Sequence, residues 1–349
     1  MSTPVPSAAA AARRMQGRRW VAMVLRGRVF SVLVFLLALV AFFSLSSDHF
    51  ATQASFRSIG ENASIFAIIA CGEGMVILTG NYDLSVGSTM GLASYVAYDQ
   101  GLLHPEISFL VIPLAAIGVG VACGLINGLL VAYGRVPSVV ATLGTLSVFR
   151  GVLYIYGARR EFTNAMMPHW SHDLVSTQVF GIVASLVVIA LVVVVVAALG
   201  LRYLPIGRQI YAVGSNPAAC DLYGLNRRRV VLRSYILCGM LTGFAGLLFA
   251  PQVSYILQYA GQDYELTVIA AVVIGGISIS GGSGNILGAG LGALLLATVN
   301  NGLVQLSLPE FARQLIQGGA IILAVLSDGL ISDRARSVLR ATRRRGVES

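Results

Sequence analysis

Residues 107–133 read ISFLVIPLAAIGVGVACGLINGLLVAY and contain no charged side chain. About 20 consecutive apolar residues are enough to cross the hydrocarbon core of a bilayer as a helix. Within this run Gly120, Gly124 and Gly128 recur every four residues. In lipid, such small residues let neighbouring helices approach closely. The stretch therefore predicts a transmembrane helix that packs tightly against another helix.

The composition of the whole chain also favours a lipid bilayer as its surroundings. Hydrophobic residues make up 56% of its 349 residues and charged residues only 11%, whereas ordinary globular domains contain roughly 25% charged residues. A soluble protein with so little charge could not cover its own surface. All 24 basic residues are Arg. Because a Walker A loop needs a Lys on the phosphates, this chain cannot carry that ATPase chemistry.

Nine further segments have the length and apolar character of a span, so we predict an all-α, polytopic membrane protein with about ten transmembrane helices. The other predicted spans are 29–46, 59–79, 84–103, 137–157, 179–201, 234–257, 265–280, 286–306 and 311–327.

The positions of the arginines predict the orientation. When ten helices alternate, 19 of the 24 arginines fall on the side of both termini, four on the other side and one within a helix. The positive-inside rule then places both termini in the cytoplasm. The predicted permease domain is 29–330, between basic tails at 1–28 and 331–349, with a large cytoplasmic loop at about 202–233. Since topology explains the basic tails, no nucleic-acid partner is expected.

Two short segments interrupt the apolar pattern. Residues 80–88 read GNYDLSVGS, and residues 275–285 read GGISISGGSGN. The first places Asp83 near the membrane, where it either caps the following helix or takes part in gating or substrate passage. The two segments occupy comparable places in the two halves of the chain, which indicates a two-fold internal repeat.

Other polar residues fall within predicted helices. They either bond neighbouring helices or line the translocation pathway. The candidates for translocation or gating are Asp83, Ser85, Ser88, Glu73, Asn127, Thr142 and Thr145. Small residues at 284, 288 and 292 (Gly284, Gly288 and Gly292) predict a helix-packing stripe. No set of Cys or His residues has convincing metal-ligand spacing, so no metal site is expected.

The large polar loop contains one recognisable helix signal. Asn216 followed by Pro217 is a favourable helix start, and Gly224 is a favourable stop. We expect about two helical turns between them, as a docking element for a cytoplasmic partner. The alternative is an ordinary basic connecting loop.

Four motifs in this order resemble the permease subunits of bacterial carbohydrate ATP-binding-cassette (ABC) importers of the ribose and xylose type. The branched-chain amino-acid permeases belong to the same superfamily. The motifs are DLSVGS at 83–88, PSVVATLGT at 137–145, GRQIYAVGSNP at 207–217, and the glycine-rich stretch 275–292. This chain departs from the family pattern at Asn81-Tyr82, at Glu73 and at Ser283.

The resemblance implies a multi-pass protein of the bacterial inner membrane that is not itself an enzyme. It would pair with a second permease chain, as a homodimer or a heterodimer. A periplasmic sugar-binding protein would deliver the solute. A separate ATPase subunit would bind ATP and Mg, so no cofactor is expected here. The resemblance also implies coupling to the ATPase through Gly207, Arg208, Asn216, Pro217 and Gly224.

Three alternatives stay open at this point. An ion-coupled secondary transporter would use Glu73 or Asp83 as its ion site. A branched-chain amino-acid ABC permease would share the architecture, although the DLSVGS element argues against it. A membrane enzyme would need clustered His or carboxylate groups near one face, which the sequence does not supply.

Overall fold

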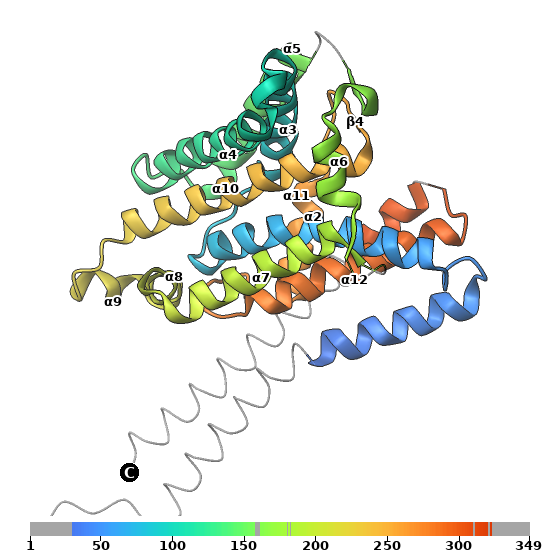
Figure 1. The fold of residues 1–349 in the computed structure, drawn as a ribbon. Coiled ribbons are helices and arrows are strands. Elements are labelled where there is room, and N and C mark those ends of the chain that lie inside the picture. Colours follow the sequence, from blue (N-terminus) through green and yellow to red (C-terminus); the bar gives the residue numbers. More distant parts are fainter. Residues whose placement is uncertain are drawn as a thin grey trace, which may run out of the picture.

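The computed structural model describes residues 30–157, 161–179, 181, 183–309, 311–319 and 322. The predicted tails 1–28 and 331–349 lie outside the described residues. The fold is a bundle of helices with a few two-residue strands (Figure 1). The longer helices are 30–46, α2 (Gln53–Leu78), α3 (Val86–Leu103), α4 (Ser108–Ala132), α5 (Ser138–Gly157), α7 (Ser185–Tyr203), α8 (Pro205–Ser215), α10 (Arg227–Val253), α11 (Tyr264–Ile274) and α12 (Ile286–Gln305).

Several short elements connect these helices, and residues 311–319 form a further helical stretch. The short helices are η1 (Pro105–Ile107), η2 (Asn164–Met166), α6 (His169–Ser176) and α9 (Pro217–Leu222). The strands are β1 (Phe162–Thr163), β2 (Gln178–Val179), β3 (Val183–Ala184) and β4 (Tyr255–Ile256), paired β1 with β4 and β2 with β3, both antiparallel.

Six helices in the described part of the chain are long and apolar enough to cross a membrane: α2, α4 with η1, α5, α7, α10 and α12. This supports a multi-pass membrane protein, while the number ten stays a prediction. The span predicted at 265–280 differs most from the structure, because α11 has only 11 residues. At 1.5 Å per residue it is about 16 Å long, roughly half of a ~30 Å hydrocarbon core.

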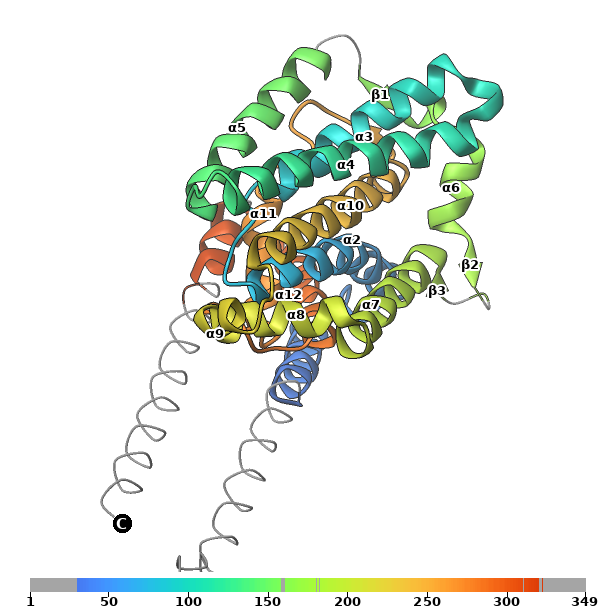
Figure 2. The same cartoon turned by 90° about the vertical axis from the view of Figure 1, so that its left-hand side faces the viewer.

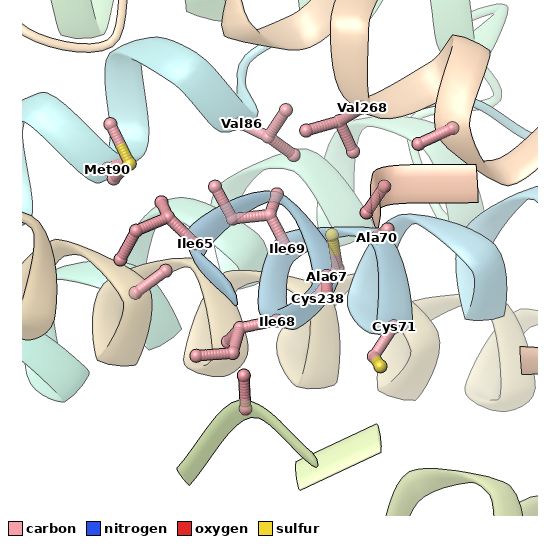
Figure 3. Close-up of a cluster of buried hydrophobic side chains, with 14 of the residues drawn as sticks. Ile65, Ala67, Ile68, Ile69, Ala70, Cys71, Val86, Met90, Cys238 and Val268 are labelled. Carbon is pink, nitrogen blue, oxygen red and sulfur yellow. The ribbon is translucent and has the colours of Figure 1, made fainter. Parts of the chain in front are cut away.

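Helix α2 forms the centre of the bundle. In its most apolar window 89% of the residues are buried, as expected for a helix that is hydrophobic on all sides. It contacts α7, α10, α11 and α12. In Figure 3, Ile65 of α2 points toward the side of Met90 of α3, Ile69 toward that of Val268 of α11, and Ile68 toward the opposite side. The core therefore unites elements from both halves of the sequence.

Helices α4, α5 and α7 form the periphery. Only 28%, 28% and 22% of the residues in their apolar windows are buried. Exposed side chains such as Leu114, Val148 and Val196 are large and apolar. In Figure 2, α5 and α7 lie on opposite sides of the central α10 and α2. Such exposed apolar faces suit contact with lipid or with another membrane chain.

Helix α4 packs against α10 through the predicted glycines. A Cβ atom on Gly120 would collide with the carbonyl oxygen of Gly239, and one on Gly239 would collide with that of Gly120. Likewise, a Cβ on Gly124 would strike the carbonyl oxygen of Tyr235. The close helix contact predicted from residues 107–133 is confirmed, and α10 is the partner.

The second glycine stripe is divided between a loop and a helix. A Cβ on Gly288 would collide with the carbonyl oxygen of Gly275, and one on Gly292 with that of Ala271. Both residues therefore let α12 approach α11. Gly284 lies before α12 rather than on it, with φ +145°, a value that L side chains rarely adopt.

The helix predicted at 179–201 begins later than expected. Residues 178–184 include the β2–β3 pair, and α7 starts at Ser185. At its other end α7 continues to Tyr203, and α10 begins at Arg227. Most of the polar segment 202–233 is thus helical, and α8 and α9 occupy its middle.

Candidate functional site

Two non-helical segments interrupt the bundle at the α8–α9 end. The first break (residues 79–85) joins α2 to α3, and the second break (residues 275–285) joins α11 to α12. The Arg distribution predicts both on the cytoplasmic side of the membrane. Both carry polar side chains or open backbone groups, which can lie at membrane depth only where protein or water satisfies them.

The two breaks contact each other directly. The backbone N–H of Gly282 donates to the carbonyl of Leu78 at 2.9 Å, and the Tyr82 hydroxyl donates to the carbonyl of Ile279 at 2.7 Å. From the opposite side, the Tyr235 hydroxyl of α10 donates to the carbonyl of Tyr82 at 2.7 Å. Neither Tyr82 nor Tyr235 was predicted as a site residue. Only the departure from the family pattern at Asn81-Tyr82 drew attention to this position.

Asp83 is the centre of a buried hydrogen-bond network. Its Oδ1 accepts the backbone N–H of Ser85 at 2.9 Å and the Ser85 hydroxyl at 2.7 Å. The Asn127 side-chain amide of α4 donates to both carboxylate oxygens, at 3.1 and 3.2 Å. Ser85, not Asp83, is the cap position of α3. Asp83 therefore both orders the start of α3 and ties it to α4.

Glu73 lies beside this network, on α2, and is fully buried. Its Oε1 accepts the backbone N–H of Asp83 at 3.1 Å, and the Cys238 thiol of α10 lies 3.9 Å from its Oε2. Among the described residues neither carboxyl group forms an ion pair. Two buried carboxyl groups without a cation are stable only when hydrogen bonds replace water.

The remaining pathway candidates divide into two groups. The Thr145 hydroxyl of α5 donates to the Asn127 side-chain oxygen at 2.6 Å and so extends the network to a fourth helix. The Thr142 hydroxyl instead donates to the carbonyl of Ser138, one turn earlier on its own helix. The Ser88 hydroxyl likewise donates to a carbonyl one turn earlier, that of Ser85. The structure therefore brings together five of the seven predicted candidates.

Helix α8 attaches to the second break and to the end of α2. The Ser215 hydroxyl donates to the carbonyl of Gly282, and the Tyr211 hydroxyl to that of Gly284, each at 3.0 Å. A Cβ on Gly214 would collide with the carbonyl oxygen of Leu78, so α8 lies directly on the end of α2. Burial raises the pKa of Tyr211, so its hydroxyl stays protonated and remains a donor at neutral pH.

The predicted helix signal at Asn216 and Pro217 corresponds to α9. The Asn216 side chain accepts the backbone N–H of Ala219 at 3.1 Å, as expected of an N-cap. Gly224 follows the helix with φ +70°, a conformation that favours glycine. The short helix expected from the sequence is therefore present.

The other two coupling candidates lie near the start of α8. A Cβ on Gly207 would strike the backbone of Leu201, so Gly207 permits the sharp turn between α7 and α8. The Arg208 guanidinium donates to the carbonyl of Tyr203 at 3.4 Å and is exposed.

Two side chains at the end of α9 were not predicted as functional. Leu222 is 88% exposed and Tyr223 is 89% exposed. Among the described residues, no other apolar side chain at the α8–α9 end of the bundle is as exposed. Two neighbouring apolar side chains that project into water mark an interaction surface. The sequence did not single out these two residues, because apolar residues are common throughout it.

The described residues contain no group of three or more His, Cys, Asp or Glu that could hold a metal ion. The site is instead a set of neutral and acidic hydrogen-bonding groups between helices. Such an arrangement can hold helices in one position and release them in another.

Comparison with known proteins gives the family. Residues 58–325 match the family described as branched-chain amino acid transport system / permease component. The chain belongs to this permease family. No solved structure matches it significantly.

Curated relatives cover most of the chain. The ribose import permease protein of Escherichia coli strain K12 is 38% identical over 306 residues, which is 85% of this chain and 92% of that protein. The ribose import permease protein of Haemophilus influenzae is 35% identical and covers 88% of this chain and 94% of its own length. An autoinducer 2 import system permease protein of Enterobacter is 34% identical, covering 84% and 85%.

Proposed function

We propose that this chain is the transmembrane permease subunit of an ABC importer that carries a sugar or a sugar-like solute across the bacterial inner membrane. The observation that carries the proposal is the similarity to ribose import permeases over 85% or more of the chain. The family description names branched-chain amino acids, but these relatives are import permeases for ribose and for autoinducer 2. They favour the carbohydrate over the amino acid.

In this proposal other chains supply the remaining parts. A separate ATPase subunit binds ATP and Mg, which agrees with the absence of Lys from this sequence. A periplasmic binding protein delivers the solute, and a second permease chain, identical or related, completes the pathway. The exposed apolar faces of α4, α5 and α7 offer surface for such a chain as well as for lipid.

The α8–α9 segment is the proposed coupling element. Leu222 and Tyr223 would insert into the ATPase subunit, and Asn216, Pro217 and Gly224 would fix the shape of α9. Movement of α9 would reach α8 directly, since one residue separates the two helices. Through Ser215 and Tyr211 it would then reach the second break.

The network around Asp83 is the proposed gate. Glu73 of α2 and Asn127 of α4 bond to Asp83 in the first break, and Thr145 of α5 bonds to Asn127. A small displacement of this break would therefore disturb the contacts of several helices at once. The ion-coupled alternative has less support. The Asp83 oxygens already accept bonds from Ser85 and Asn127, which leaves few lone pairs for a cation.

Purification of the tagged chain in a mild detergent tests the proposal. We expect an ATP-binding subunit to co-purify in near-equal amount. We expect Leu222→Ala combined with Tyr223→Ala to lose that subunit while the chain remains folded. Tyr203→Ala is the matched control, because Tyr203 is an exposed tyrosine at the end of α7.

Two results would contradict the proposal. If the chain purifies alone and, after reconstitution, takes up sugar without ATP, it is a secondary transporter. If the ATPase subunit binds the Leu222→Ala, Tyr223→Ala variant normally, the importer assignment stands but α9 is not its docking element.

A further inference from the structure

A polar cavity lies apart from the network around Asp83. Its volume is about 430 Å³, and it is bounded by α11, α12 and the helical residues 311–319. Such a volume lies within the ~300–1,000 Å³ range of small-molecule sites. More than half of its lining residues carry polar side chains, although apolar atoms provide the larger share of the lining surface. The polar lining includes Gln262, Asp263, Thr267, Asn300, Gln314 and Gln317.

The cavity reaches membrane depth. Phe66 and Leu296 belong to its wall, and they lie midway along α2 and α12. The segment before α11 also descends into the bundle, because a Cβ on Gly87 in the first turn of α3 would collide with the carbonyl oxygen of Gly261. Polar groups at this depth are costly unless they face a partner, water or a ligand.

The short helix α11 begins at this cavity. Tyr264, Leu266 and Thr267 of its first turn line the wall. Asp263 precedes the helix, but its side chain makes no capping hydrogen bond. The first N–H groups of a helix have no partner within the helix, and here the Glu265 carboxyl group accepts from the backbone N–H groups of Asp263 and Glu265. Discontinuous helices that start inside the membrane are a common way to build a solute site.

The chemistry of the wall suits a neutral polyhydroxylated solute. A hydroxyl group both donates and accepts, and side-chain amides offer both functions. The Asn300 and Gln317 side-chain amides line the cavity. Phe66 and Tyr264 lie against each other at 4.8 Å between ring centroids and give the cavity an aromatic side, against which the apolar face of a sugar can pack.

We propose that this cavity binds the transported sugar on the extracytoplasmic half of its path, before it reaches the gate at Asp83. The inference rests on the proposed function for the solute class, while the site itself is argued from the cavity. A charged solute is a poorer match, because Asp263 and Arg313 contribute opposite charges to the same wall.

Cysteine labelling of the full chain in intact cells tests this site. The four native cysteines are buried, so a new cysteine can be followed. Asn300→Cys places a thiol in the cavity. Leu315→Cys is the matched control on helical residues 311–319, since Leu315 is 78% exposed and does not line the cavity.

We expect a membrane-impermeant methanethiosulfonate reagent, added from outside, to label Asn300→Cys at least about tenfold faster than Leu315→Cys, because a thiol reacts only when it can ionise in water. Millimolar D-ribose should slow the labelling of Asn300→Cys several-fold and leave Leu315→Cys unchanged. Uptake of radiolabelled D-ribose by the unsubstituted chain is measured in parallel.

Three outcomes would overturn the inference. Equal, slow labelling of both variants would mean that the cavity has no aqueous connection to the outside. Fast labelling that D-ribose does not slow, with ribose uptake intact, would reject the site while sparing the importer. Fast labelling without protection and without any ribose uptake would count against the sugar assignment itself as well as the site.

Discussion

The two breaks occupy similar places in the fold but are stabilised by different chemistry. The first break is stabilised mainly by hydrogen bonds to side chains. Asp83 accepts from Ser85 and Asn127, and Glu73 accepts the backbone N–H of Asp83. In the second break the backbone dominates, and glycines adopt positive φ at positions 276, 281, 282 and 284.

This difference bears on the expected internal repeat. The position of a break recurs in each half of the chain, whereas the means of stabilising it does not. The repeat therefore stays a prediction about architecture. It also follows that loss of one carboxylate should destabilise the first break, and that gain of one methyl group should destabilise the second.

The largest expected effect is that of Gly282→Ala in the second break. Gly282 has φ +72°, and an added Cβ would lie 2.5 Å from the backbone nitrogen of Ser215. The unfavourable φ and the overlap together should cost about 3 kcal/mol or more. A thermal-shift measurement on the detergent-solubilised chain should show a clear loss of stability.

Gly181→Ala is the matched control for this change. Gly181 has a nearly equal φ of +71°, but an added Cβ would meet no atom within 4 Å. Only the conformational part of the cost remains, about 1 kcal/mol. Equal losses for the two variants would mean that contact with α8 is not what constrains the second break.

A smaller effect is expected from Asp83→Ala in the first break. The substitution removes the buried acceptor of the Ser85 hydroxyl and leaves the Asn127 amide with only the Ser85 hydroxyl oxygen as acceptor, which should cost about 2 kcal/mol. Asp83→Asn keeps one acceptor oxygen, so it should lower the free energy of unfolding by about half as much. Unfolding temperature and sugar uptake are the measurements.

Ser283→Ala serves as the corresponding polar deletion in the second break. Ser283 is exposed, so its replacement should change the free energy of unfolding by less than about 0.5 kcal/mol. If Ser283→Ala proved as harmful as Asp83→Ala, the contrast between side-chain and backbone stabilisation would be wrong.

An effect smaller than that of Asp83→Ala is expected where α8 joins the second break. Tyr211→Phe removes the hydrogen bond to the carbonyl of Gly284 and should cost about 1 kcal/mol. Because burial raises the pKa of Tyr211, this hydroxyl remains a donor, and the loss should be the same at pH 6 and pH 9. Tyr203→Phe, at an exposed tyrosine, should leave stability and uptake unchanged at both pH values.

Much of the helical architecture could be predicted from local sequence. The uncharged run at 107–133 and the glycines within it predicted a tightly packed helix, and the Asn216-Pro217 and Gly224 pair predicted α9. Such features depend on backbone propensity and on the solvent, both of which act over a few residues. The prediction at 265–280 was too long, because hydropathy counts apolar residues without regard to where the helix ends.

The candidate site was predicted only as a set of separate residues. Glu73, Asp83, Asn127 and Thr145 were singled out one by one, since each is polar within an apolar run. That the first three lie in hydrogen-bond contact depends on how α2 and α4 pack around the first break. Thr142, equally polar and three residues from Thr145, donates to the carbonyl of Ser138 on its own helix, which its residue type does not reveal.

The sequence by itself determined the solvent, the class of fold and the family, because these follow from composition, periodicity and ordered motifs. Only the tertiary structure decided that the two breaks meet, that α8 joins the second break to the end of α2, and that a cavity opens beside α11. Each of these depends on contacts between residues about 70 to 200 positions apart, and the packing that produces them is not written in any local stretch of the chain.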